Sequence, residues 1–147
     1  MIIKEIKKIS KLQIYFIFQL RNKLYVRNAS LNQEKINFKS HVLWIENFKK
    51  NKNKFFLIKI NNKNIGYIRI EKNNNFLNTS WALDKKYHGS GYMTTALKAV
   101  TDYSINNISR FKAFILKENL ASIKVAKKSG FKKMNLKRNF YVFQKKL

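Results

Sequence analysis

The sequence predicts a single α+β domain in which a mixed, twisted sheet is flanked by helices. Two observations support this fold class. Segments with the alternation of strands and segments with the three- and four-residue spacing of helices follow one another in the order βααβββαβαβ. The chain of 147 residues shows no repeat, linker or change in composition. We therefore expect one domain over residues 1–147, large enough to bury a core without disulfides or a structural metal.

The first half of the chain is expected to hold one strand, two helices and then three strands. A helix should begin after Ser10, whose hydroxyl can cap its first turn. A second helix is indicated by residues on one face, namely His41, Trp44, Ile45 and Phe48. Asn61-Asn62-Lys63 is typical of a hairpin turn. The expected strands cover 2–6, 55–60, 64–71 and 76–83, and the expected helices cover 10–20 and 38–48.

The second half is expected to alternate helices and strands. A long helix is indicated by apolar residues at helical spacing, namely Met93, Ala96, Leu97, Val100 and Tyr103. A shorter helix should end before Gly130, since glycine is common just after a helix. The expected helices cover 92–106 and 120–129, and the expected strands cover 111–116 and 140–143.

The composition excludes several kinds of site. The chain has no cysteine and two histidines, which rules out thiolate chemistry, zinc fingers and iron–sulfur clusters, and we expect no metal. Its net charge is +25, but lysine outnumbers arginine 27 to 5 and the excess is spread evenly along the chain. An A+T-rich coding sequence explains this pattern better than a nucleic-acid surface, which would favour arginine. A positive field will still attract anionic small molecules.

The apolar segment Leu12–Leu20 does not have the properties of a targeting signal. It has no small-residue cleavage site, runs straight into Arg21 and is too short to cross a bilayer. We expect a buried helix there, no membrane span and a cytoplasmic location.

Two of the four glycines fall in one loop between a predicted strand and a predicted helix, His88-Gly89-Ser90-Gly91-Tyr92-Met93. A helix that begins after such a loop has free N–H groups in its first turn and about half a positive charge, so it can bind an anion. Glycine also lets a phosphate approach the backbone. The loop is neither a Walker A sequence nor a full GxGxxG motif. Taken alone, it fits a plain structural turn equally well.

The segment 119–131 adds a second motif, a helix that begins at a capping asparagine and ends at Gly-Phe. Together with the loop, it resembles the GNAT superfamily of acyl-CoA-dependent N-acyltransferases. The family's Gln/Arg-x-x-Gly-x-Gly/Ala motif falls on 88–93 with Gly91 as its central glycine, and its Asn-x-x-Ser/Ala…Gly-Phe helix falls on 119–131. His88 and Met93 depart from the first motif. The resemblance covers residues 76–131.

The resemblance implies a splayed pair of central strands, at 80–83 and 111–116, that opens a slot for the pantetheine arm of acetyl-CoA, the cosubstrate. Backbone groups of Trp81, Ala82 and Leu83 would pair with that arm. One N–H there would hold the thioester oxygen as negative charge develops. Trp81 fits a core position equally well. The other coenzyme contacts would come from Asn119 and from the N–H groups that hold the pyrophosphate, those of His88, Gly89, Ser90, Gly91, Tyr92 and Met93.

The resemblance also indicates where protons are exchanged. In many relatives a tyrosine protonates the departing thiolate; Ala126 occupies the matching position, so that acid is missing. Ser122 lies one helical turn earlier and is the candidate donor, directly or through water. The alternative is a hydroxyl bonded to its own helix backbone. For the base that deprotonates the amine we expect His41, with Glu71 as a second candidate; a structural histidine and a solvated glutamate are the alternatives.

The region before the glycine loop resembles GNAT enzymes that acylate amino sugars carried on a nucleotide, in bacterial surface-glycan pathways of the pseudaminic and legionaminic type. The resemblance rests on Arg21-Asn22, Val26-Arg27, Ser30, Ile36 and 41–44, and on Arg69. Guanidinium groups suit a diphosphate, and a tryptophan can stack on a sugar or base. The expected partner is therefore a small-molecule amine, a sugar nucleotide, held by Arg21, Arg27, Trp44 and Arg69. Solvated helix-end arginines and a core tryptophan are the alternatives.

Two other functions stay open at this point. The segment 91–99 closely matches the helix start of protein N-terminal acetyltransferases of the ribosomal-protein type. Ala126 and the charge of +25 also fit a catalytically inactive GNAT domain that acts as a basic binding module.

Overall fold

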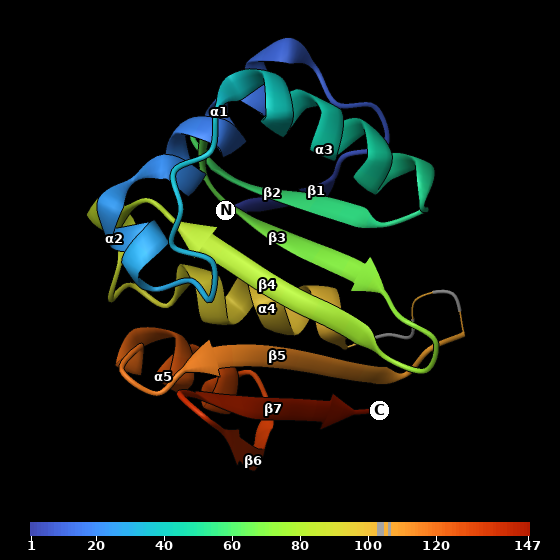
Figure 1. Ribbon diagram of the computed structural model, residues 1–147, viewed down its shortest axis with the longest axis vertical. Helices are drawn as coiled ribbons and strands as arrows, with labels where there is room; N and C mark the ends of the chain where they lie inside the picture. Colours follow the sequence, from blue (N-terminus) through green and yellow to red (C-terminus); the bar gives the residue numbers. More distant parts are fainter. Residues whose placement is uncertain (103–104, 106) are drawn as a thin grey trace.

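The computed structural model describes residues 1–102, 105 and 107–147. Within these residues, seven strands form one sheet in the order β1-β2-β3-β4-β5-β7-β6. β4 and β5 run parallel, and the other neighbouring strands run antiparallel. The predicted α+β fold with a mixed sheet is therefore confirmed (Figure 1).

The strands and helices follow one another largely as predicted. The strands are β1 Ile2–Glu5, β2 Lys54–Ile60, β3 Lys63–Lys72, β4 Leu77–Leu83, β5 Arg110–Leu116, β6 Lys132–Lys137 and β7 Phe140–Lys146. The helices are α1 Lys11–Asn22, α2 Leu24–Asn28, α3 Phe38–Lys50, α4 Tyr92–Thr101 and α5 Leu120–Lys128, and a 3₁₀ turn covers Lys85–Tyr87.

Local chemistry explains two of these boundaries. Ser10 and Gln13 exchange side-chain to backbone hydrogen bonds at the start of α1, the reciprocal arrangement called a capping box. Asn61 and Asn62 both have positive φ and connect the paired ends of β2 and β3. A two-residue hairpin turn of type I′ requires this conformation, so the predicted turn is confirmed.

Helices cover both faces of the sheet and create two cores. On one face, α1, α2 and α3 pack on β2 and β3, with Ile17, Ile45 and Phe55 fully buried. On the other face, α4 and α5 pack on the central strands, with Leu97 and Phe111 fully buried. Because both faces are covered, a ligand can reach the centre of the sheet where two strands separate.

That separation occurs between β4 and β5, and we call it the fork. The parallel ladder pairs Leu77 with Phe111 and Asn78 with Lys112. Beyond Asn78 the two strands diverge toward their carboxyl ends (Figure 1). The inner edges of the diverging strands need other hydrogen-bond partners, which is the geometry expected of a splayed central pair.

One predicted helix is shorter in the structure. The helix expected over 92–106 ends at Thr101, and Ile105 instead forms an isolated β-bridge with Ile108. The continuation of the prediction over Tyr103, Ser104 and Asn106 lies outside the described residues.

Two short elements, α2 and β6, were not predicted from the sequence. α2 occupies five residues of the polar stretch between α1 and α3, and its one buried residue is Val26. Because it is so short, its sequence shows no helical periodicity. β6 is exposed along its whole length and rich in lysine, so the apolar alternation typical of a strand is missing. Tertiary pairing with β7 holds β6 in place.

No helix in the described part of the chain is long and apolar enough to cross a membrane. The segment Leu12–Leu20 lies in α1, which buries Ile17 and Leu20. The expected helix is present, but it is buried on one face only, because Leu12 and Tyr15 are exposed.

Candidate active site

A cavity of about 770 Å³ lies at the fork between β4 and β5. Its walls come from α1, α2, α3 and their loops on one side, and from α4, α5 and the loop before α4 on the other. Most residues predicted for the site line it, namely Arg21, His41, Trp44, Arg69, Trp81, Ala82, Leu83, His88, Gly89, Gly91, Tyr92, Met93, Asn119 and Ser122. The lining does not include the predicted residues Arg27, Glu71 and Ser90.

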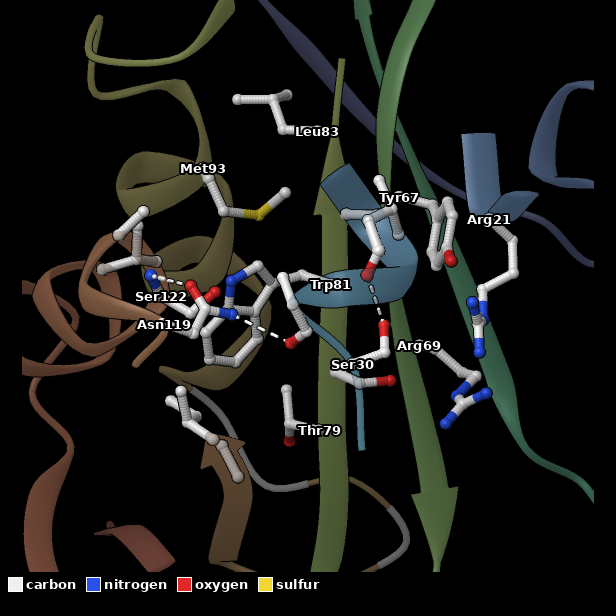
Figure 2. A pocket seen from close by; sticks show the side chains of 18 of the residues that line it. Arg21, Ser30, Tyr67, Arg69, Thr79, Trp81, Leu83, Met93, Asn119 and Ser122 are labelled. Carbon is white, nitrogen blue, oxygen red and sulfur yellow. Dashed lines mark hydrogen bonds between the residues drawn. The ribbon is translucent and has the colours of Figure 1, made fainter. Parts of the chain in front are cut away.

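β4 runs between two ends of this cavity (Figure 2). Met93, Asn119 and Ser122 lie on one side of the strand, which we call the α4–α5 end. Arg21 and Arg69 lie on the other side, which we call the arginine end. The predicted coenzyme and acceptor residues are thus separated by one strand.

The α4–α5 end contains a helix N-terminus without a side-chain cap. Gly91 is the N-cap residue, with φ of 79° and no side-chain hydrogen bond, so the N–H groups of the first turn stay free. Gly89 has φ of 81°, which glycine adopts without strain. A Cβ at either position would meet none of the described atoms within 4 Å. The space over this turn is open, and the free N–H groups suit an anion.

The loop that leads into α4 is braced by two rings. Nε2 of His88 lies 2.9 Å from the carbonyl oxygen of Leu83; since a carbonyl only accepts, this contact requires the proton on Nε2. The rings of Tyr25 and His88 meet edge to face at 5.9 Å. The Tyr25 hydroxyl also accepts a hydrogen bond from the Lys85 N–H at 3.1 Å. The His88 side chain therefore supports the loop, which leaves backbone groups for a ligand.

The backbone of β4 presents free groups to the fork. The Asp84 N–H donates to the Ile65 carbonyl at 2.8 Å, which fixes the direction of the others, because alternate residues of a strand face the same neighbour. Ala82 therefore directs its N–H and C=O toward β3. Trp81 and Leu83 direct theirs toward the opening, where the Leu83 carbonyl already accepts the hydrogen bond from His88 and the Leu83 N–H and both Trp81 groups remain for a ligand. Of the three residues predicted to pair with the pantetheine arm, these two have backbone groups placed to do so.

Both functional groups of the Asn119 amide are engaged (Figure 2). Oδ1 accepts from the Ser122 N–H at 3.0 Å, which caps α5, and Nδ2 donates to the Ala29 carbonyl at 3.0 Å. The Ser122 side chain lines the cavity, one turn from that cap. Ala126, at the position of the family's tyrosine, is fully buried in the core and has no proton to donate.

Two guanidinium groups meet at the arginine end. Arg21 donates from Nη2 to the Asn32 carbonyl at 2.6 Å, and its buried Nη1 has no partner among the described residues. Arg69 places Cζ 5.2 Å from the ring centre of Trp44, and its buried Nε also lacks a hydrogen bond there. Burial is the main cause that lowers the pKa of Arg21, and the charge of Arg69 lowers it further. Unused donors on two neighbouring cations favour an anionic ligand.

His41 lies in the wall of the arginine end between two aromatic rings. Its ring centre is 5.6 Å from Phe18 and 5.7 Å from Trp44, and the residue is 3% exposed. Neither ring nitrogen makes a hydrogen bond of normal geometry with a described residue. Burial lowers the pKa of His41 to about 4, so the imidazole is neutral at neutral pH. One nitrogen of the neutral ring can accept a hydrogen bond and the other donates, but the basicity of the ring is weak.

Glu71 and Arg27 lie outside the lining of the cavity but act on residues that line it. The Glu71 carboxylate accepts a hydrogen bond from Asn78 Nδ2 at 3.0 Å and lies 3.7 Å from Arg69 Nε. Asn78 and Arg69 both line the cavity, so Glu71 orients two lining residues and offsets part of one charge. Arg27 lies on α2, close enough for its charge to lower the pKa of Arg21 as well.

Several lining residues were not indicated by the sequence pattern, namely Tyr25, Tyr67, Asn78 and Thr79. Tyr67 is buried on β3 opposite Ala82. Burial raises the pKa of its phenol, so the hydroxyl stays protonated and can donate a hydrogen bond. Residues two apart on a strand share a face, so the position of Tyr67 two residues before Arg69 is the feature that identifies it in the sequence.

Among the residues described here, no group of three or more histidine, aspartate or glutamate side chains could hold a metal ion. The expectation of a metal-free site stays a prediction.

Comparison with known proteins identifies a matching protein family. The sequence model described as an acetyltransferase (GNAT) domain matches residues 16–132. A curated relative, the probable N-acetyltransferase YjcK of Bacillus subtilis strain 168, is 38% identical over 58 residues, which cover 38% of this chain and 32% of that protein. The match thus spans about one third of the relative's length.

Solved structures share the fold over nearly the whole chain. A ribosomal-protein-alanine N-acetyltransferase from Brucella melitensis has a TM-score of 0.83 at 16% identity, with 100% of both chains covered. The N-acetyltransferase PseH of Campylobacter jejuni, in complex with acetyl coenzyme A, has a TM-score of 0.73 at 17% identity and covers 99% of this chain and 97% of its own. At these identities the likeness shows the fold alone.

Proposed function

The chain belongs to the GNAT acetyltransferase family, and from this premise we propose that it transfers the acetyl group of acetyl-CoA to the primary amine of a nucleotide-linked amino sugar. The observation that carries the proposal is the two-ended cavity at the fork. One end offers free backbone N–H groups and an open strand edge, and the other offers two half-buried guanidinium groups. The first end suits the coenzyme, and the second suits an anionic acceptor.

The α4–α5 end fits the coenzyme group by group. The free N–H groups after Gly91 would hold the pyrophosphate, and the opening of the fork at Trp81 and Leu83 would take the pantetheine arm along β4. The acceptor nitrogen forms a bond to the thioester carbon, the carbon–sulfur bond breaks, and the thiolate departs. A β4 N–H that points into the fork would stabilise the oxyanion between these events, an effect worth about 10²–10³ in rate.

The arginine end supports an acceptor with a negative group. Arg21 keeps an unused donor at Nη1, and Arg69, whose Nε is paired with Glu71, lines the cavity beside it. Trp44 contacts both Arg69 and His41, so it acts partly by orienting the arginine. A polycationic amine would be repelled by these charges and by the net charge of +25. A diphosphate would instead gain charge-assisted hydrogen bonds, each worth about 1.5–3 kcal/mol.

The proton transfers are assigned to residues near each end. Ser122 would donate a proton to the thiolate at the α4–α5 end, directly or through water, and would take a proton back from solvent. At the arginine end, His41 is the nearest histidine, but its ring is a weak base with buried nitrogens, so the proton of the ammonium group would pass to water in the cavity and on to bulk solvent. Glu71 would act through Arg69 and Asn78, which it contacts. Because acetyl-CoA is an intracellular metabolite, the proposal places the protein in the cytoplasm.

The test is a thiol-release assay with acetyl-CoA and three acceptors. These are a UDP-linked 4-amino-4,6-dideoxy sugar, the same sugar without the nucleotide, and a ribosomal-protein amino-terminal peptide. The UDP-sugar should have the highest kcat/KM. Arg21→Gln and Arg69→Gln should each raise its KM on the order of 10- to 100-fold, the loss of one charge-assisted contact. Arg138→Gln, a matched change in the turn between β6 and β7, should have no effect.

Other outcomes select the alternatives. Peptide turnover equal to that of the UDP-sugar would support a protein N-terminal acetyltransferase. Coenzyme binding without turnover of any amine would support an inactive domain that acts as a binding module. Equal turnover of the free and the nucleotide-linked sugar would show that the arginines do not bind the diphosphate.

A further inference from the structure

A short segment reaches both walls of the fork. Residues 25–32 comprise most of α2 and the start of the loop that follows it, and we call them the bridge. Its cavity-lining residues are Tyr25, Val26, Ala29, Ser30, Leu31 and Asn32. In Figure 1, α2 lies at the carboxyl ends of the diverging strands. The bridge therefore borders both ends of the cavity.

The first anchor of the bridge is Tyr25, which is fixed to the segment after β4. Its hydroxyl accepts a hydrogen bond from the Lys85 N–H at 3.1 Å. Its ring also packs edge to face on His88 at 5.9 Å, and His88 in turn is bonded to the carbonyl of Leu83. One end of the bridge is thus tied to the loop predicted to hold the pyrophosphate.

The second anchor is Asn119, which follows β5. Its Nδ2 donates to the Ala29 carbonyl at 3.0 Å, across 90 positions of sequence (Figure 2). The same side chain caps α5 through Oδ1 and the Ser122 N–H. A single amide thus joins the helix on the β5 wall to the bridge, and the bridge connects the two strands where their own ladder has opened.

The bridge also determines where Arg21 points. The Arg21 side chain donates from Nη2 to the Asn32 carbonyl at 2.6 Å, three residues beyond the bond from Asn119. Within the bridge, the Ser30 hydroxyl donates to the Val26 carbonyl at 2.6 Å, which links α2 to the loop. A displacement of the bridge would therefore move the acceptor of the Arg21 hydrogen bond and turn its guanidinium group.

We propose that Tyr25 and Asn119 are positioning residues for the acceptor. They hold the bridge against the two walls of the fork so that Arg21 keeps its free donors in the cavity. This inference rests on the proposed function in that it takes the arginine end as the acceptor site. It also assigns the Asn119 side chain mainly to the bridge, whereas the sequence resemblance implies a coenzyme contact.

Two substitutions remove the hydrogen bonds that hold the bridge and keep the other contacts of Tyr25 and Asn119. Asn119→Ser keeps a good helix cap, since serine caps about as well as asparagine, but its hydroxyl is too short to reach Ala29. Tyr25→Phe removes the hydroxyl that accepts from Lys85 and keeps the ring beside His88. Tyr15→Phe is the matched control, because Tyr15 is half-exposed on α1 and lies outside the described lining of the cavity.

Four quantities are measured for each variant. With the UDP-linked amino sugar, the acceptor KM should rise about two- to tenfold, the range for an ordinary hydrogen bond. The Kd of coenzyme A and the Tm should stay close to those of the parent. Hydrogen–deuterium exchange of residues 29–36, measured with coenzyme A present, should become faster in both variants and stay unchanged in Tyr15→Phe.

Hydrogen–deuterium exchange tests whether Tyr25 and Asn119 hold the bridge, and it does not require an active enzyme. Unchanged exchange of residues 29–36 in both variants would overturn the inference, whatever the activity. An increase in the Kd of coenzyme A as large as that in acceptor KM would also overturn it and make Asn119 a coenzyme contact. If the parent acetylates none of the acceptors while exchange responds as expected, the proposed function fails and the anchoring of the bridge stands.

Discussion

The Ser122 side chain lines the cavity in the first turn of α5, and the buried Ala126, one turn later, stands where the family has its tyrosine. We predict that Ser122→Ala lowers kcat about 10²-fold, as for a positioned acid, with little change in KM. Alanine favours the helix, so α5 should keep its structure. Steady-state kinetics test this, with Thr95→Ala, an exposed change on α4, as the control. A loss below about twofold would leave water as the acid.

His41 connects stability to pH. Burial lowers its pKa to about 4 in the folded protein, whereas the unfolded chain takes up the proton near the ordinary value of about 6.5. Between these values the unfolded state binds more protons. The free energy of unfolding should therefore fall as pH drops from about 6.5 to about 4, by at most about 1.4 kcal/mol per pH unit. Above about pH 6.5, His41 adds no pH dependence.

His41→Gln, which cannot titrate, isolates this effect. Denaturant unfolding of parent and variant at about pH 7.5 and about pH 5 should show a smaller loss of stability in the variant. Identical pH dependence of the two proteins would contradict the burial of a neutral imidazole.

At the scale of elements, Gly66 sets the approach of β3 to β4. A Cβ at this position would lie 2.6 Å from the Ala82 carbonyl oxygen and 2.9 Å from Leu83 Cδ1, so the two strands would have to move apart. We predict that Gly66→Ala destabilises the protein by on the order of 1–3 kcal/mol and weakens coenzyme A binding, because Leu83 leads into the glycine loop. Thermal unfolding and calorimetry measure both effects.

An exposed residue of the same strand supplies the control. Lys63→Ala, at the start of β3, should change stability by less than about 0.5 kcal/mol. If Gly66→Ala were equally harmless, β4 would be free to shift, and the fork would not depend on close packing of these strands.

At the scale of the whole molecule, the net charge of +25 creates a field that favours anionic ligands. We predict that coenzyme A binds several-fold more weakly when salt rises from about 0.05 M to about 0.5 M, because the Debye length shortens. Pantetheine, which carries no phosphate, is the matched ligand and should lose little affinity. Equal losses for the two ligands, measured by calorimetry, would show that the field does not contribute to coenzyme binding.

Much of the fold and of the α4–α5 end could be predicted because the determinants are local. Ser10 with Gln13, Asn61 with Asn62, and Gly91 at the start of α4 each act within a few residues. The exposed β6 could not be predicted, because its lysine-rich sequence matches no period and its pairing with β7 alone defines it.

The sequence by itself determined the order of the elements other than α2 and β6, the glycine loop before α4 and the capping role of Asn119, since each follows from patterns or backbone chemistry over a few residues. Only the tertiary structure decided which groups share the cavity. It brought Arg21 of α1 beside Arg69 of β3, joined Asn119 to Ala29, and turned the backbone of Trp81 and Leu83 toward the fork. The physical reason is that strand register and packing between distant segments fix these directions, and neither is expressed in local sequence.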